Sequence, residues 1–319
     1  MRALITGIAG FAGSHLAEYL LAQTEWEVWG IDLRPSENIA HLRPQLRFLQ
    51  GDLTDDQRVM ETLREARPDV IFHLAAQAYV PLSWQDPWGT LETNIRAQVN
   101  LLQGVVRLGL EPRILVVGSN EEYGLIAPEE LPVKETNPLR PDSPYGVSKI
   151  AQDMLGFQYH LSHGLKIVRV RPFNHIGPRQ KEHFVAPAFA KQIAEIEAGL
   201  GPPVIRVGNL SPQRDFTDVR DMVRAYHLAI TQGEVGEVYN IGSEQPRSIR
   251  ELLETLLSLS PIPIRVEQDP SRFRPSDVPV SYCDASKFRA RTGWEPRIPF
   301  QQSLRDVLDD WRERIRARR

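Results

Sequence analysis

Three glycines near the amino terminus constrain the fold of this chain more than any other feature. Gly7, Gly10 and Gly13 follow a short apolar run and precede a stretch with apolar residues at helical spacing. A strand, a glycine-rich turn and a helix in this order are typical of a dinucleotide-binding fold. The glycines allow a sharp turn, a close approach of the backbone to a pyrophosphate, and tight packing of helix on strand. The first helical residues, Phe11 and Ala12, then offer N–H groups to the phosphates.

An acidic residue stands where such folds hold the adenosine ribose. Residues 27–31 predict a second strand, and Asp32 ends it, about 20 residues past the glycines, with Leu33 beside it. A carboxylate there accepts hydrogen bonds from the ribose hydroxyls and repels a 2′-phosphate, which favours NAD(H). Arg34 can attract that phosphate instead, so NADP(H) stays open as the alternative.

The rest of the first half alternates short apolar runs with helical patterns. Strands are expected at 47–49, 70–74, 114–117 and 165–170, and helices near 56–66, 87–108 and 146–163. This alternation predicts an α/β fold of the Rossmann type, in which helices cover both faces of a doubly wound parallel sheet.

The pattern changes after about residue 171, where proline and glycine become frequent. We therefore expect an NAD(P)-binding Rossmann domain at 1–172, with returning segments near 217–241. Residues 173–319 are expected to form mainly a smaller, mixed α/β substrate-binding lobe, which is discontinuous for that reason. Trp294 and an amphipathic helix from about 300 to 315 are expected to close the fold.

Residues at the strand ends are candidates for cofactor contacts, because ligands bind at the carboxyl edge of such sheets. Asp52 and Leu53 follow the third strand, and the Asp52 carboxylate suits an adenine amino group. Leu74, Ala75 and Ala76 end the fourth strand. The small alanines would let the cofactor lie against the backbone, and core packing is an equally good explanation for them.

Composition excludes several classes of protein. The formal net charge of −3 gives no basic excess for binding nucleic acid or an anionic membrane. No apolar run reaches the roughly 20 residues that span a bilayer, and the chain opens on a strand rather than a signal peptide. Cys283 is the sole cysteine and the histidines lack metal-ligand spacing, so neither an internal disulfide nor a metal site is expected. A cytoplasmic protein is the simplest expectation.

Tyr145 and Lys149 carry the chemistry that the glycine turn makes plausible. Positions i and i+4 share one face of a helix, so a phenol and an ammonium are held close. We expect the cation to lower the pKa of Tyr145 toward working pH, which suits proton transfer to or from an alcohol. The spacing alone is weak and occurs on many surface helices.

A serine and two acids follow the fifth strand. The Ser119 hydroxyl can hydrogen-bond a substrate carbonyl oxygen, or it can simply cap the loop. Glu121 is ambiguous, since it suits a general base, a group that binds sugar hydroxyls, or a solvated acid. Glu122 is expected to be solvated.

Over almost its full length the chain resembles the extended short-chain dehydrogenases/reductases that act on nucleotide sugars. The resemblance implies hydride-transfer catalysis by Ser119, Tyr145 and Lys149. It rests on Thr6, Gly7, Gly10, Gly13, Asp52-Leu53, His73 to Ala76, Asn94, Ser119, Tyr145, Lys149, Arg214-Asp215-Phe216 and Gly293-Trp294-x-Pro296.

Within that family the chain most resembles GDP-4-keto-6-deoxy-D-mannose reductases. The stretches 118–124, 173–178 and 207–221 carry this likeness, and Asn120 departs from it where those enzymes tend to have a second serine. The implied reaction is NAD(P)H-dependent reduction of the 4-keto group, of the type that converts GDP-4-dehydro-6-deoxy-D-mannose to GDP-D-rhamnose. Glu121 keeps a GDP-mannose 4,6-dehydratase, or an epimerase with bound NAD(P), as the alternative.

Four further residues are expected on the substrate side, with Ser119, Glu121 and Tyr145. The resemblance implies that Asn174 contacts the nucleotide diphosphate. Arg214 and Arg274 can bind phosphate through two hydrogen bonds each, although a surface ion pair is the commoner role of an arginine. Asp277 is a candidate for ribose or base. The GDP moiety, and a homodimer formed through helices 87–108 and 146–163, follow from the resemblance only.

Overall fold

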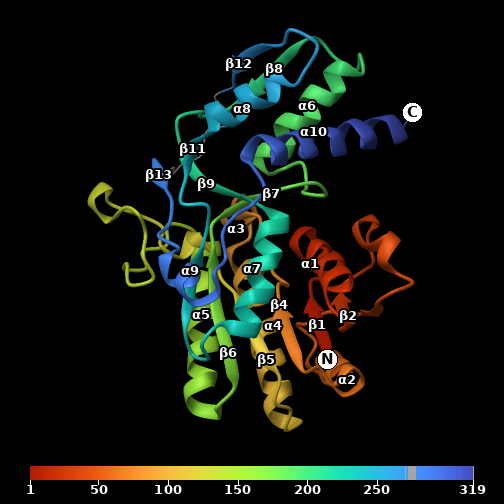
Figure 1. Ribbon diagram of the computed structural model, residues 1–319, viewed down its shortest axis with the longest axis vertical. Helices are drawn as coiled ribbons and strands as arrows, with labels where there is room; N and C mark the ends of the chain where they lie inside the picture. The colour runs from red at the N-terminus through yellow and green to blue at the C-terminus, as the bar shows by residue number, and fades with distance from the viewer. Residues whose placement is uncertain (270, 272–277, 319) are drawn as a thin grey trace.

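The protein consists of two parts, a larger one built on a parallel sheet and a smaller one beyond its carboxyl edge (Figure 1). The structure is a computed structural model that describes residues 1–269, 271 and 278–318. In Figure 1 the sheet occupies the lower half, and α6, α8 and α10 occupy the upper half.

Seven parallel strands form the larger sheet, in the order β10-β6-β5-β4-β1-β2-β3. Their bounds are β1 Arg2–Thr6, β2 Glu27–Asp32, β3 Arg47–Gln50, β4 Val70–His73, β5 Arg113–Val117, β6 Lys166–Pro172 and β10 Val238–Ile241. The strand order reverses between β1 and β4, and such a switch point opens a crevice at the carboxyl ends of the strands.

Helices cover both faces of this sheet, as the sequence predicts. Successive strand residues point to opposite faces, so Leu4 joins the core beneath α2 and α4, whereas Ile5 joins the core beneath α1 and α7. The helices of this part are α1 Phe11–Gln23, η1 Glu37–Leu42, α2 Asp56–Ala66, α3 Val80–Gln85, α4 Pro87–Arg107, α5 Pro144–His163, α7 Val219–Gln232 and α9 Ser286–Thr292.

The smaller part has its own sheet and its own apolar core. Strand β9 (Gln213–Asp218) pairs in parallel with β7 (Asn174–Ile176) and β13 (Val280–Ser281), and antiparallel with β11 (Pro246–Ser248), so the sheet is mixed. Strands β8 (Val204–Val207) and β12 (Arg265–Gln268) form a separate pair. The helices that enclose this core are α6 Val185–Glu197, α8 Ile249–Ser258 and α10 Phe300–Ala317.

The chain passes between the two parts more than once. It leaves the large sheet at β6, enters β7 directly, and returns through α7 and β10. The buried Trp294 secures the last return, because its indole N–H donates to the Asp221 carbonyl at 3.0 Å and its ring packs against Phe288. The Asp221 carboxylate also accepts the backbone N–H groups of Arg297 and Ile298.

Candidate active site

The glycine turn has the geometry that a pyrophosphate requires. Gly7 has a φ of +73°, and a Cβ there would lie 3.0 Å from the Ala75 backbone. A Cβ on Gly13 would lie 2.2 Å from the Gly7 carbonyl oxygen. Helix α1 begins at Phe11, and its N-cap Gly10 supplies no side-chain cap. The first-turn N–H groups of Phe11, Ala12 and Gly13 therefore face the turn, where an anion can accept from them.

Asp32 ends β2 beside this turn, and its carboxylate orders the loop around it. One oxygen accepts the Ala9 N–H at 2.9 Å and the other accepts the Leu33 N–H at 2.8 Å. Burial raises the pKa of Asp32, while these hydrogen bonds and the charge of Lys181 lower it. Lys181 comes from the loop before α6, so the smaller part reaches the end of β2. The sequence carried no signal for this contact.

The remaining cofactor candidates lie along the carboxyl edge of the sheet. Asp52 is exposed and its carboxylate accepts the Thr54 N–H, whereas Leu53 is buried. Leu74, Ala75 and Ala76 are half-buried at the end of β4. The backbone of Ala75 lies against Gly7, so the approach of β4 to the glycine turn depends on the absence of a Cβ at Gly7.

Ser119 and Tyr145 meet beyond the end of β5. Ser119 follows that strand and caps the short helix η2 (Asn120–Glu122), accepting the Glu121 N–H at 3.2 Å. Helix α5 begins with Ser143 as its N-cap, and a Cβ on Gly146 would lie only 2.6 Å from the Glu121 carbonyl oxygen. This close approach brings Tyr145 within hydrogen-bonding reach of Ser119.

The expected effect of Lys149 on Tyr145 is wrong. Burial raises the pKa of Tyr145 well above its usual value, Glu121 and Glu122 raise it further, and the hydrogen bond with Ser119 opposes them. The Lys149 ammonium instead donates to the Val117 carbonyl at 2.7 Å and to Gln152 Oε1 at 2.8 Å. Burial lowers the pKa of Lys149 to about 8, and the charge of Glu122 opposes this shift.

The expectation that Glu122 is solvated is also wrong, since its side chain is fully buried. It accepts the Ser119 N–H at 2.8 Å and lies 2.9 Å from Arg171 Nε. Arg171 and Arg169 both pair with the buried Asp153 of α5. Burial raises the pKa of Glu122, and Arg171 opposes it. Two arginines alternating in an otherwise apolar strand were the signal for buried acids.

Glu121 and Asn174 lie on two sides of the site. Glu121 is half-buried and close enough to Tyr145 to act on its pKa. Asn174 begins β7, and the described part of the chain gives its buried side-chain oxygen no hydrogen-bond partner. A polar atom of this kind is available to a ligand.

Of the two arginine candidates, only Arg214 lies among the described residues. Arg214 is half-buried in β9, and its Nη1 donates to the carbonyls of Gln213 and Val278. The guanidinium therefore ties β9 to the segment that begins at 278. Arg274 and Asp277 lie outside the described residues.

Asp215, next to Arg214, is a structural carboxylate that the sequence did not distinguish. It is fully buried and accepts the Ser243 N–H at 2.7 Å, the Ser243 hydroxyl at 2.6 Å and the Glu244 N–H at 3.0 Å. The Cys283 N–H donates to it at 3.3 Å. Asp215 thus ties two segments, at residues 243–244 and at residue 283, to β9.

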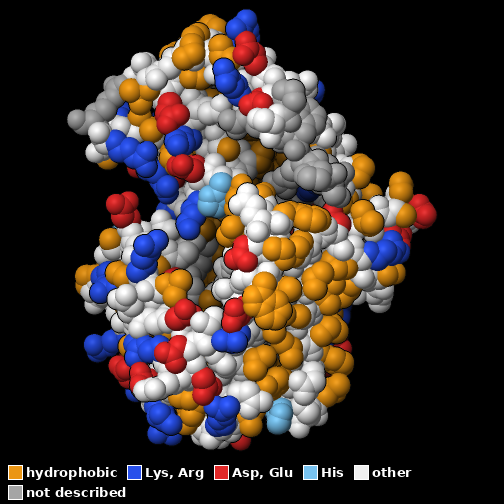
Figure 2. Space-filling model, turned by 180° about the vertical axis from the view of Figure 1, so that it is seen from behind, with side chains coloured by type: hydrophobic (Ala, Val, Ile, Leu, Met, Phe, Trp, Pro, Cys, Tyr) orange, Lys and Arg blue, Asp and Glu red, His pale blue; other side chains and the backbone are white. Residues whose placement is uncertain are grey.

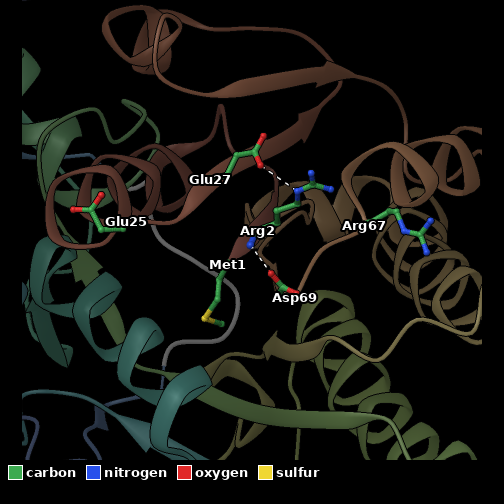
Figure 3. Close-up of a pocket in the computed structure, with 6 residues that line it drawn as sticks. All are labelled: Met1, Arg2, Glu25, Glu27, Arg67 and Asp69. Atoms are coloured by element: carbon green, nitrogen blue, oxygen red, sulfur yellow. Dashed lines mark hydrogen bonds and ion pairs between the residues drawn. The ribbon is translucent and has the colours of Figure 1, made fainter.

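Figure 2 shows the surface hollowed between the two parts, above the large sheet. A second hollow, of about 500 Å³, lies at the opposite edge of the sheet, where the strands begin (Figure 3). Its charges are largely satisfied, since Arg2 pairs with Glu27 at 3.1 Å and donates its N–H to Asp69. The candidate active site is therefore the carboxyl edge. The second hollow is lined by Met1, Arg2, Glu25, Glu27, Arg67 and Asp69.

The profile of one family, GDP-mannose 4,6 dehydratase, matches residues 4–307. The chain belongs to this family. Among curated relatives, a GDP-6-deoxy-D-mannose reductase from Pseudomonas aeruginosa is 36% identical over 99% of this chain and 98% of that protein. A GDP-mannose 4,6-dehydratase from Vibrio cholerae is 30% identical over 96% of this chain and 92% of that protein.

Solved structures confirm the Rossmann-type fold of this GDP-mannose 4,6 dehydratase family member. RMD from Pseudomonas aeruginosa, complexed with NADPH, is 35% identical, with a TM-score of 0.87 over 98% of this chain and 100% of that one. The Thermus thermophilus UDP-glucose 4-epimerase, complexed with NAD, is 33% identical, with a TM-score of 0.86 over 98% and 99%. Both neighbours hold a nicotinamide cofactor, which supports the cofactor class predicted from the glycine turn.

None of the helices in the described part of the chain combines the length and hydrophobicity that a bilayer-crossing segment requires. Among the same residues, no three or more His, Cys, Asp or Glu side chains are grouped as ligands for a metal ion.

Proposed function

We propose that this protein reduces the 4-keto group of a GDP-linked 4-keto-6-deoxy sugar, using hydride from NAD(P)H. The observation that carries the proposal is the meeting of Ser119 and the protonated Tyr145 at the carboxyl edge of a dinucleotide-binding sheet. The full-length likeness to a GDP-6-deoxy-D-mannose reductase supports the choice of substrate. The product is the corresponding alcohol, of the GDP-D-rhamnose type.

Each member of the triad has one task in this reaction. When bound, the dinucleotide supplies a hydride to the sugar C4. The Tyr145 hydroxyl donates its proton to the carbonyl oxygen as that oxygen becomes an alkoxide, and solvent later restores the proton. The Ser119 hydroxyl orients the carbonyl and stabilises the developing negative charge. The Lys149 ammonium would hold the nicotinamide ribose.

The residues that would hold the dinucleotide fit it. Gly7 and Gly13 allow the turn to pack closely, because a Cβ at either position would press on backbone atoms, and the uncapped start of α1 offers N–H groups to the phosphates. Asp32 would accept from the ribose, with Leu33, Asp52, Leu53 and Ala76 around the adenosine. We retain NAD(H) as the favoured cofactor and NADP(H) as the alternative, because Lys181 also lies near Asp32.

The smaller part would hold the rest of the substrate. We propose that residues 173–319, apart from the returning segments near 217–241, bind the GDP-sugar, with Asn174 and Arg214 toward the diphosphate. Arg274 and Asp277 complete this set as predictions from the sequence. The unpartnered Asn174 oxygen supports a ligand at this position.

Supplying the keto sugar with reduced cofactor tests the proposal directly. GDP-4-keto-6-deoxy-mannose and NADPH or NADH are mixed with the purified protein, and nicotinamide absorbance is followed. We expect oxidation that depends on the keto sugar and yields the 4-hydroxy product by mass spectrometry. Absence of oxidation with every GDP- or dTDP-linked 4-keto sugar would exclude the reductase.

A dehydratase or epimerase is the second candidate, and the closeness of Glu121 to Tyr145 favours keeping it. A dehydratase removes a proton from sugar C5, for which a carboxylate beside the tyrosine is suited. Incubating GDP-mannose in heavy water without added cofactor discriminates. Deuterium at C5 of a 4-keto product would indicate the dehydratase, whereas an unchanged, unlabelled sugar excludes it.

We also propose a homodimer, formed through one face of α4 and α5. Val147, Met154 and Leu161 lie seven residues apart on α5, and all three are exposed. Trp84 and Trp88, near the start of α4, are 53% and 71% exposed. Hydrophobic side chains gather on this part of the surface in Figure 2. Heptad spacing of apolar residues is typical of helix-bundle interfaces, and exposed apolar patches often mark sites of protein association.

A cytoplasmic location follows from the same proposals. The single cysteine, Cys283, is free and buried, as suits a reducing compartment. We therefore propose that the protein acts in the cytoplasm.

A further inference from the structure

A chain of buried hydrogen bonds leads from Lys149 on α5 to Thr6 at the end of β1. Lys149 Nζ donates to Gln152 Oε1 at 2.8 Å, and Gln152 Nε2 lies 3.3 Å from His73 Nε2. His73 Nδ1 lies 2.9 Å from Thr6 Oγ1. All four side chains are at most 4% exposed, so water does not compete for these contacts.

The chemistry of Lys149 fixes the orientation of the Gln152 amide. An ammonium has only donors, so the Gln152 oxygen must face it and the Gln152 amide nitrogen must face His73. That nitrogen is also only a donor, so His73 Nε2 must accept. With His73 neutral, this places its proton on Nδ1, facing Thr6 Oγ1. Thr6 Oγ1 then has three N–H groups around it, because it also accepts those of Leu74 and Ala75. The opposite tautomer would let the Thr6 hydroxyl donate to Nδ1, but it would set His73 Nε2–H against the Gln152 amide nitrogen.

The chain ends on the strands that carry the cofactor edge. Thr6 Oγ1 also accepts the backbone N–H groups of Leu74 at 3.2 Å and Ala75 at 3.1 Å. Thr6 ends β1 and immediately precedes Gly7. A displacement of Lys149 would therefore disturb the backbone on both sides of the strand-order reversal.

We propose that Gln152 is a positioning residue that holds the Lys149 ammonium in place, and that His73, as its Nδ1–H tautomer, orients the Gln152 amide. The inference rests on the proposed reductase function, in which the Lys149 ammonium would hold the nicotinamide ribose. Gln152 supplies a neutral acceptor where a carboxylate would draw the ammonium away, and His73 prevents the amide from turning over.

The charged groups around Lys149 make this acceptor important. Glu122 of η2 faces it and favours its charged form, whereas burial lowers the pKa of Lys149 to about 8. On its own helix lie Tyr145 and Asp153, and Asp153 is paired with two arginines. Burial first, and then the charge of Lys149, lower the pKa of His73 to about 3, so His73 stays neutral at working pH.

Variants of Gln152 should shift the pH profile of reduction in opposite directions. Loss of the Lys149 charge ends activity on the alkaline side. Gln152→Glu stabilises the ammonium and should move the alkaline limb of kcat to higher pH, whereas Gln152→Leu should move it to lower pH. We expect kcat near neutral pH to fall about tenfold in Gln152→Leu, with the KM for the sugar little changed.

His73→Phe completes a double-mutant cycle. It removes the acceptor that orients the Gln152 amide, so its alkaline limb should move as in Gln152→Leu, and the double variant should be no worse than either single variant. The matched control is Gln103→Leu, which removes another glutamine bonded to α5, through Tyr159. The control should keep the wild-type limb.

A substrate-free measurement separates this proposal from the proposed function. Long-range ¹H–¹⁵N correlation spectra of the histidine rings should show His73 as the Nδ1–H tautomer, without titration between about pH 5 and 8. Three results would overturn the proposed roles of Gln152 and His73: an Nε2–H tautomer of His73, a titration of His73 near pH 6.5, or the same alkaline limb of kcat in both Gln152 variants. If the wild type does not oxidise NAD(P)H with the keto sugar, the proposed reductase function is wrong. The spectra would still test the hydrogen bonds between Lys149, Gln152, His73 and Thr6.

Discussion

Burial sets the protonation state of Tyr145. The phenol is enclosed between α5 and η2, and the acids Glu121 and Glu122 oppose its ionisation. At neutral pH the side chain therefore carries its proton, which is the form that a reductase needs in order to donate to a ketone. An enzyme working in the oxidative direction would need the phenolate. This protonation state suits the proton-donating role that we propose for Tyr145.

Tyr145→Phe should remove this proton donor without disturbing the fold. We expect the rate of keto-sugar reduction to fall by about 10²–10⁴-fold, because that is the usual contribution of a positioned general acid. Binding of NADPH, followed by its fluorescence, should change little. Tyr159→Phe on the same helix is the control, and it should retain activity. Comparable losses in both variants would mean that α5, rather than the phenol, had been damaged.

Residue spacing predicted which side chains meet, but not what each one contacts. The i, i+4 rule placed Tyr145 and Lys149 on one face of a helix, and this is correct. It could not show that Lys149 donates to Val117 and Gln152, because those contacts depend on how α5 crosses the sheet. For the same reason Glu122 read as a loop acid, although Arg171 from β6 lies against it.

Helix α5 carries both the Tyr145–Lys149 pair and an exposed apolar stripe. Its first turn is fixed by the Ser143 cap and by Pro144, whose ring suits the first helical position, and this extends the helix two residues before the predicted start at 146. Tyr145 and Lys149 face the sheet. Val147, Met154 and Leu161 are exposed, so the same helix presents an apolar stripe, on which we propose that a second subunit packs.

Met154→Glu should separate the proposed dimer. A carboxylate in the middle of an apolar helix interface would be desolvated without a partner, which costs several kcal/mol and exceeds what one face can offset. Sedimentation equilibrium should give a dimer for the wild type and a monomer for the variant. Leu200→Glu, an exposed leucine beyond α6, should remain dimeric. A monomeric wild type would rule out this interface.

Elements with strong local patterns were the most predictable from sequence. The strands at 27–32 and 70–73 and the helix at 56–66 match their predicted positions within a residue or two, because hydrophobic period and turn signals agree there. The short strands β7, β11 and β13 were not individually predicted. Each is two or three residues long and is fixed by pairing with β9, which is a long-range contact.

At the scale of the whole molecule, Arg179 joins the two parts beside the glycine turn. It adopts a φ of +71°, which side-chain-bearing residues rarely take, and its N–H donates to Asp310 of α10 at 3.0 Å. Its guanidinium contacts His15 Nδ1 at 2.6 Å and pairs with Glu18, both on α1. The smaller part is thereby anchored to α1, the helix whose first turn we propose binds the cofactor phosphates.

His15 makes this junction sensitive to acid. Burial and then the charge of Arg179 lower the pKa of His15 to about 4, against the opposing effects of the Pro178 carbonyl, Glu18 and Asp218. His15 binds a proton near pH 6.5 in the unfolded chain but only near pH 4 in the folded protein. The contribution of His15 to the free energy of unfolding is therefore fully present above pH 6.5 and is lost as pH falls toward 4. The shift corresponds to at most about 3 kcal/mol from this residue.

His15→Gln should reduce the pH dependence of the free energy of unfolding. An amide can still donate to the Pro178 carbonyl and accept from Arg179, but it takes up no proton, so its free energy of unfolding should fall less between pH 6.5 and 4 than that of the wild type. Urea titrations at several pH values measure the difference. His163→Gln, at the exposed end of α5, should follow the wild-type curve. Because His73 adds a similar dependence from inside the sheet, the His15 variant should keep a reduced slope rather than none. A slope equal to that of the wild type would show that His15 is protonated as easily in the folded junction as in the unfolded chain.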